Sequence, residues 1–149
     1  MAANPRLVIE MREHIAFVNT SKLAAPGGHY SHAVRYGDLV FVSGQLGIRP
    51  DGSHTAHLPF EDQVQQALEN MLTALRLAGA TAADVLKVTA YIVDVERWPR
   101  FNALYAEVMG NARPARTVVP VAQLHYGYLV EIDAIAVCRG DSRQQDLPR

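Results

Sequence analysis

Apolar residues recur at helical spacing in the segment that follows Phe60. Six of them share one helix face, at Val64, Ala67, Leu68, Met71, Leu72 and Leu75, while Glu61, Gln65, Gln66, Glu69 and Arg76 lie largely off it. Gly79 stands where the residue after a helix end commonly adopts a left-handed conformation. The pattern therefore predicts an amphipathic helix from Phe60 to just before Gly79.

A second apolar stripe predicts another helix from about Glu96 to Met109, with Asp94 as its cap and Pro114 beyond its end. The stripe consists of Trp98, Phe101, Leu104, Tyr105 and Val108. Between the two helices, Thr81 and Asp84 have the spacing of a capping box, with Asp in place of Glu. A short turn is expected there.

Runs rich in β-branched and aromatic residues predict strands at residues 14–19, 31–35, 39–43, 85–93, 117–121 and 129–137. Gly37 and Asp38 predict a hairpin turn between two of these runs. The order of strands, helix, strand, helix and strands predicts an α+β sandwich with both helices on one sheet face. Several strands are apolar at nearly every position, so the other face must also be covered, most simply by self-association.

The length of 149 residues suits one domain, expected at residues 14–139 between a flexible extension at 1–13 and a flexible tail at 140–149. Hydrophobic residues make up 49% of the chain and charged residues 19%, which is enough apolar material for a core. The net charge of −1 argues against a dedicated nucleic-acid or membrane-surface binder.

The single cysteine, Cys138, excludes an internal disulfide and a cysteine-based metal site, and it is interpreted as a core or surface thiol. No apolar run approaches the roughly 20 residues of a membrane span, and the chain start has no hydrophobic signal core. These features predict a cytoplasmic protein.

Two histidines, His54 and His57, are three residues apart, and Glu61 follows them. They fall in a loop flanked by proline and glycine, and the sequence places no third strong ligand beside them. A solvated loop is therefore favoured over a metal site, and no metal or other cofactor is predicted.

Arg116 opens a strand of β-branched residues, directly after Pro114 and Ala115. Such an arginine is either part of a structural ion pair or an anion clamp, because its planar fork of donors matches a carboxylate. Glu131 and Asp133 share one face of the last strand, so Arg116 and Glu131 could simply neutralise each other. Spacing alone leaves both interpretations open.

Six segments form an ordered set of motifs: Ala25-Pro-Gly-Gly-His-Tyr30-Ser-His-Ala33, Val42-Ser43-Gly44-Gln45-Leu46, Asn70 with Leu75 and Ala78-Gly79-Ala80, Asn102-Ala-Leu-Tyr105, Pro114-Ala115-Arg116-Thr117, and Val130-Glu131-Ile132-Asp133-Ala134-Ile135-Ala136. Together these segments resemble the Rid family, the reactive intermediate deaminases also called the RidA, YjgF or UK114 group. The resemblance runs in order from about Ile15 to Val137.

The resemblance implies a chorismate-mutase-like fold, with a mixed sheet of about six strands, and a homotrimer with clefts between subunits. It also implies cofactor-free hydrolysis of 2-imino acids, formed from enamines such as 2-aminoacrylate, to 2-keto acids and ammonia. In this sequence Arg116 would then bind the substrate carboxylate, and Glu131 would position or activate water. Tyr30 is expected as a further catalytic residue, with Ser43, Gly44 and Thr117 in the substrate-binding region.

The chain departs from the family pattern at several positions near the expected pocket mouth. These are His29, His32, Val118, Asp133 and the segment Leu124-His125-Tyr126-Gly127. The departures bear on substrate identity more than on reaction type. Two other functions attributed to such proteins stay open, which are RNA cleavage with translation inhibition, and a non-catalytic binding or chaperone-like trimer.

Overall fold

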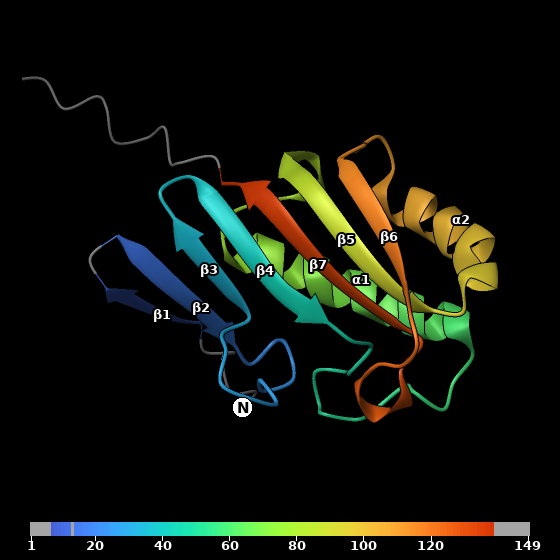
Figure 1. Ribbon diagram of the computed structural model, residues 1–149. Coiled ribbons are helices and arrows are strands. Elements are labelled where there is room, and N and C mark those ends of the chain that lie inside the picture. The colour runs from blue at the N-terminus through green and yellow to red at the C-terminus, as the bar shows by residue number, and fades with distance from the viewer. Residues whose placement is uncertain (1–6, 13, 139–149) are drawn as a thin grey trace, which may run out of the picture.

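The computed structural model describes residues 7–12 and 14–138, which form one sheet with two helices on one of its faces (Figure 1). The elements in chain order are β1 (Leu7–Arg12), β2 (Ile15–Thr20), β3 (Ala33–Tyr36), β4 (Leu39–Gln45), α1 (Phe60–Leu77), β5 (Val85–Val93), α2 (Trp98–Met109), β6 (Ala115–Val121) and β7 (Val130–Val137). Short 3-10 turns occupy Ala82–Asp84, Val95–Arg97 and His125–Gly127. None of the helices in these residues is long and apolar enough to cross a membrane.

The strands of the described chain form a seven-stranded mixed sheet in the order β1-β2-β3-β4-β7-β5-β6. Neighbouring strands are antiparallel except β5 and β6, which are parallel. Parallel neighbours need a crossover connection, and α2 supplies it between β5 and β6. The last strand, β7, therefore lies in the middle of the sheet, between β4 and β5.

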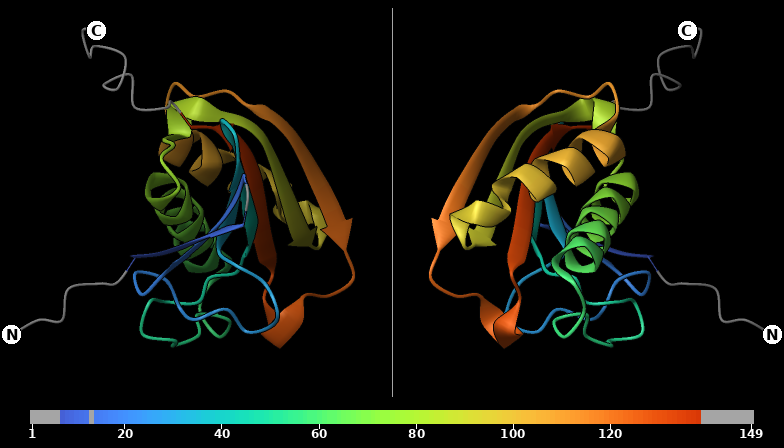
Figure 2. Two further views of the ribbon diagram at one scale, coloured as in Figure 1. Left: turned by 90° about the vertical axis from the view of Figure 1, so that its left-hand side faces the viewer. Right: turned by 90° about the vertical axis from the view of Figure 1, so that its right-hand side faces the viewer.

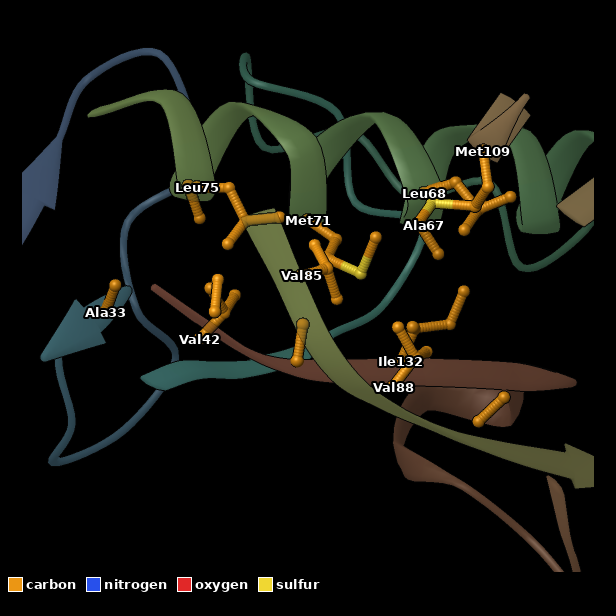
Figure 3. Close-up of a cluster of buried hydrophobic side chains, with 14 of the residues drawn as sticks. Ala33, Val42, Ala67, Leu68, Met71, Leu75, Val85, Val88, Met109 and Ile132 are labelled. Atoms are coloured by element: carbon orange, nitrogen blue, oxygen red, sulfur yellow. The ribbon is translucent and has the colours of Figure 1, made fainter. Parts of the chain in front are cut away.

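The helix α1 buries the face that its apolar spacing predicts. Val64, Ala67, Leu68, Met71 and Leu75 are all buried against the sheet (Figure 3). The helix ends where expected, because Gly79 adopts a φ of +92° that residues with a side chain rarely accept. The prediction of the first helix and its end is confirmed.

Both helices lie on the same face of the sheet, as expected (Figure 2). The second helix begins at Trp98, two residues later than predicted, because Val95–Arg97 form a separate 3-10 turn. Asp94 caps that turn, accepting a hydrogen bond from the Glu96 backbone N–H. The capping box is also present. The Thr81 side chain accepts from the Asp84 N–H, and the Asp84 side chain accepts from the Thr81 N–H.

The opposite face of the sheet is open in the single chain. Along β4, Val40 and Val42 point into the core, whereas Leu39 and Phe41 are 38% and 42% exposed. In one copy the strand at residues 39–43 is therefore buried on one face only. An uncovered apolar face is what the self-association hypothesis requires.

The expected extension at residues 1–13 contains strand β1, which pairs along its whole length with β2. That stretch has little pattern of its own, and its strand conformation comes from the backbone partners that β2 provides. The boundary at residue 14 therefore does not separate an extension from the domain. The predicted tail at 140–149, like residues 1–6, 13 and 139, lies outside the described residues.

Gln63 is a fully buried polar side chain at the start of α1. Its amide nitrogen donates to the carbonyls of Ala56 and Leu58, and its oxygen accepts from the N–H of Leu129. One side chain thus ties the loop before α1 to the start of β7.

We expect Gln63→Leu to lower the free energy of unfolding by about 1–3 kcal/mol, because three part-buried backbone groups lose the hydrogen bonds that Gln63 makes with them. Urea denaturation at fixed protein concentration measures the change. Gln65→Leu, at an exposed position on the same helix, is the matched control and should change stability by less than about 0.5 kcal/mol. Equal stability of the two variants would contradict the anchoring role.

Candidate active site

A cavity of about 600 Å³ opens where the end of β4 and the start of β7 meet three loops. The loops come from residues 23–30, 46–54 and 125–126, and they gather at one end of the sheet (Figure 1). Of the residues expected in the site, Tyr30, Ser43, Gly44 and Glu131 all line this cavity. Those four predicted positions are therefore brought together in one copy.

The loop that carries Tyr30 is held by the buried side chain of His32. Its Nδ1 accepts from the Thr20 N–H at 3.2 Å, and its Nε2 donates to the Ala24 carbonyl at 2.8 Å. Because Nδ1 must accept, the ring proton lies on Nε2. His32, a departure from the family pattern, therefore has a structural role.

Two hydrogen bonds join this loop to β4. The Ser43 hydroxyl donates to the Ser31 carbonyl at 2.6 Å, and the Ser43 N–H donates to the His32 carbonyl at 3.1 Å. The Tyr30 hydroxyl accepts from the Gly27 N–H at 3.2 Å. Ser43 thus supports the wall of the cavity through one hydrogen bond from its side chain and one from its backbone.

The carboxylate of Glu131 lies directly over Gly44. A Cβ atom added to Gly44 would overlap Glu131 Oε1, so only glycine leaves room for the carboxylate there. Within the described residues no side chain donates a hydrogen bond to this carboxylate or pairs with it. A carboxylate in this position is free to interact with water or a ligand in the cavity.

The half-buried position of Glu131 changes its acidity. Desolvation raises the pKa of Glu131, the nearby His125 opposes that rise, and Asp133 adds to it. A raised pKa moves a carboxyl group towards the range in which it can both accept and return a proton near neutral pH. Burial in the cavity wall therefore makes the Glu131 carboxyl a weaker acid than an exposed glutamate.

Arg116 is held on the edge strand β6 by two residues of α2. Its guanidinium donates to Asn102 Oδ1 at 2.9 Å and lies 4.7 Å from the centre of the Tyr105 ring. Asn102 and Tyr105 are three positions apart, so they share one face of the helix. This support uses one nitrogen and one face of the guanidinium, which leaves further N–H donors for an anion.

Arg116 and Glu131 project from opposite faces of the sheet. Arg116 aligns with Val88 and Ala134, whose side chains are buried towards the helices. Glu131 alternates with the buried Val130 and Ile132 and points the other way. The hypothesis that Arg116 and Glu131 neutralise each other is therefore wrong within one chain.

Thr117, the other predicted binding residue on β6, also lies apart from the cavity. Its hydroxyl accepts from Lys87 Nζ at 2.7 Å, and neither Arg116 nor Thr117 lines the cavity. The predicted site residues thus form two groups, one at the cavity and one on the edge strand.

The loop that carries His54 and His57 contributes to the cavity, which the spacing of the two histidines did not indicate. His54 lines the cavity, and its Nδ1 lies 3.3 Å from the hydroxyl of the buried Tyr128. His57 is exposed. Across residues 7–12 and 14–138, no three His, Cys, Asp or Glu side chains are grouped closely enough to hold a metal ion.

Sequence reasoning missed the roles of several residues. Asn102 and Tyr105 were quoted only as a motif, and they position Arg116. His125 and Tyr126 were noted only as departures, and both line the cavity with His54. The helical spacing of Asn102 and Tyr105 was a usable signal, whereas no pattern in the sequence links His54 with Tyr126.

Comparisons with known proteins show which family this architecture belongs to. The family model described as Endoribonuclease L-PSP matches residues 20–138. A RutC family protein of Pyrococcus horikoshii is 39% identical over 126 residues, covering 85% of this chain and 98% of the relative. The 2-iminobutanoate/2-iminopropanoate deaminase of Dermatophagoides farinae is 35% identical over 120 residues, covering 80% and 94%.

Solved structures agree with these relatives. The crystal structure of Escherichia coli TdcF with bound serine matches with a TM-score of 0.77 and 30% identity, covering 83% of this chain and 98% of that chain. The fold is of the YjgF, chorismate-mutase-like class. The chain belongs to the Endoribonuclease L-PSP family, which is the YjgF/RidA family that its motifs resemble.

We expect Gly44→Ala to displace the Glu131 carboxylate, since the new methyl group would overlap its oxygen. A crystal structure of the variant should show the side chain of Glu131 rotated away from β4. Gly28→Ala is the control, because a Cβ there meets only Tyr30 at an ordinary 3.6 Å. An unmoved Glu131 in Gly44→Ala would show that the close approach imposes no constraint.

Proposed function

We propose that this protein hydrolyses 2-imino acids to 2-keto acids and ammonia, with Glu131 as the general base. The observation that carries the proposal is the Glu131 carboxylate, which lies over Gly44 in the cavity, has a raised pKa, and has no side-chain partner among the described residues. Two comparisons support the substrate class. One relative is named a 2-iminobutanoate/2-iminopropanoate deaminase, and TdcF is described with bound serine, a small amino acid.

The proposed active site needs a second copy of the chain. Arg116 lies on the edge strand β6 and on the opposite face from Glu131, so it cannot reach the cavity of its own chain. In a homotrimer with clefts between subunits, Arg116 of one copy would complete the cavity of the next. The exposed Leu39 and Phe41 on the open sheet face supply apolar surface for such an assembly.

The proposed chemistry starts from a protonated imine, which is already a good electrophile and needs no Lewis acid. The fork of Arg116 donors binds the substrate carboxylate at two points and fixes the imine carbon in place. A water oxygen then bonds to that carbon while Glu131 accepts one of the water protons. The product of this step is a tetrahedral carbon bearing a hydroxyl and an amino group.

Collapse of the intermediate completes the reaction. Glu131 returns its proton to the nitrogen, the C–N bond breaks, and the hydroxyl loses its proton to become the keto group. The released ammonia takes up that last proton, so a protonated imine and water yield a keto acid and ammonium. Tyr30 closes one side of the cavity, and its hydroxyl is available to hold the water or the departing nitrogen.

Purified protein treated with EDTA should release keto acid from freshly generated imino acids faster than the spontaneous reaction. The imines can be produced in place by an amino acid oxidase, and keto acid can be followed by chromatography. Glu131→Gln should lose most of this activity because an amide cannot accept the water proton.

RNA incubated with the same protein tests the ribonuclease function, which the family description suggests and the net charge of −1 disfavours.

We expect Arg116→Lys to lose about 10²-fold in kcat/KM while remaining folded, because lysine holds the carboxylate at one point only and the substrate can swing. The matched control is Arg100→Lys, at an exposed arginine paired with Glu61. Keto acid release and melting temperature should be measured for both variants.

A fully active Arg116→Lys enzyme would refute the carboxylate clamp. Light scattering provides a separate check, since the wild type should have the mass of a trimer at micromolar concentration. A monomer that still hydrolyses imino acids would show that Arg116 of a neighbouring copy is not required.

A further inference from the structure

In a single copy, before a neighbouring Arg116 enters, the cavity is larger than a three- or four-carbon imino acid needs. Its volume of about 600 Å³ falls within the roughly 300–1,000 Å³ of pockets that enclose drug-sized ligands. In the proposed reaction, the reacting end of a substrate occupies only the part of the cavity next to Glu131. The remaining space is lined in part by the aliphatic side chains of Leu23, Leu46 and Ile48, which suits an apolar group rather than more solvent.

One wall of this space consists of aromatic rings from two loops. The centre of the Tyr126 ring lies 4.9 Å from that of His54, and 6.2 Å from that of His125. Tyr126 is 62% exposed, and Tyr30 elsewhere in the cavity lining is 51% exposed. Large rings exposed in a concave site are available to contact a ligand.

The backbone of Tyr126 is in the left-handed region, with φ of 58° and ψ of 17°. A bulky residue with a side chain rarely adopts this conformation, which has a conformational cost. Since the ring is mostly exposed, burial in the core does not offset that cost. The conformation instead presents the ring at the cavity, with its hydroxyl so near Gly27 in the opposite loop that a Cβ added to Gly27 would lie 3.3 Å from it.

His54, beside Tyr126, is held in a defined orientation. The buried Tyr128 hydroxyl accepts from the Thr55 N–H at 3.0 Å, so its own proton is available to His54 Nδ1 at 3.3 Å. This hydrogen bond constrains the orientation of the His54 ring, which lies beside the Tyr126 ring at the cavity.

We propose that the cavity selects 2-imino acids with a planar aromatic side chain, which packs against Tyr126 and His54 while the imino acid end lies at Glu131. This inference rests on the proposed hydrolysis and names the substrate class within it. Offset or edge-on packing of rings adds to the gain from apolar burial, and that gain distinguishes an aromatic substrate from an alanine-derived one.

The test compares kcat/KM for the imino acids generated in place from phenylalanine and from alanine. The wild type should prefer the phenylalanine-derived imine by about tenfold or more. Tyr126→Asn removes the ring with a residue that tolerates the left-handed backbone, and it should reduce the ratio of the two values about tenfold. Tyr126→Phe retains the ring and should retain the ratio.

A control variant and a second variant in the cavity test whether a change in the ratio is specific to the aromatic wall. Tyr36→Ala, at an exposed tyrosine that does not line this cavity, should leave the ratio unchanged. His54→Leu should lower the ratio less than Tyr126→Asn, since an apolar side chain remains. If the alanine-derived imine is hydrolysed at least as well, or if Tyr126→Asn keeps the wild-type ratio, the aromatic preference is refuted. If neither imine is hydrolysed, the proposed function itself fails.

Discussion

The alternation of side chains along β7 is the constraint on which the rest of this structure depends. Val130, Ile132, Ala134 and Ala136 are buried towards the helices, so the intervening Glu131 must point to the other side. A shift of one residue in register would bury the carboxylate in the core and expose its apolar neighbours. The same residues that build the core therefore determine where the Glu131 carboxylate lies.

The loops around Glu131 owe their shape to buried polar side chains rather than to regular structure. His32 bridges the backbone at Thr20 and Ala24, and Asn70 donates to the carbonyls of Leu46 and Ile48. Gln63 binds the segment between them and the start of β7. Because a buried polar group without partners is costly, each of these side chains restricts its loop to one conformation. A cavity with defined walls follows from that restriction.

The placement of Arg116 links the fold to an assembly. The parallel crossover from β5 through α2 leaves β6 at the sheet edge, and α2 orients Arg116 through Asn102 and Tyr105. The oriented Arg116 cation on the edge strand and the Glu131 carboxylate on the opposite face would be the two halves of the proposed site. Separation of the halves in one chain is the physical basis for placing the proposed active site between copies.

Periodicity in the sequence was sufficient for both helices, the last three strands within one or two residues, and the layering of helices on one sheet face. Local patterns of this kind report which face of an element is buried, and Gly79 and the Thr81–Asp84 box reported where elements end. The motifs also identified Tyr30, Ser43, Gly44 and Glu131, which the structure brings to one cavity. Strand β1 was missed because its conformation depends on pairing with β2 and not on its own residues.

Only the tertiary structure decided which of the remaining residues meet. It separated Arg116 from Glu131, gave Asn102 and Tyr105 their roles, and brought His54 beside Tyr126 and Tyr128. These relations join segments far apart in the chain, and they depend on strand order, on sheet face and on a left-handed backbone at Tyr126. The sequence by itself determined the elements and their buried faces, because these follow from neighbours along the chain. Contacts between distant loops follow from packing in three dimensions, which no local spacing records.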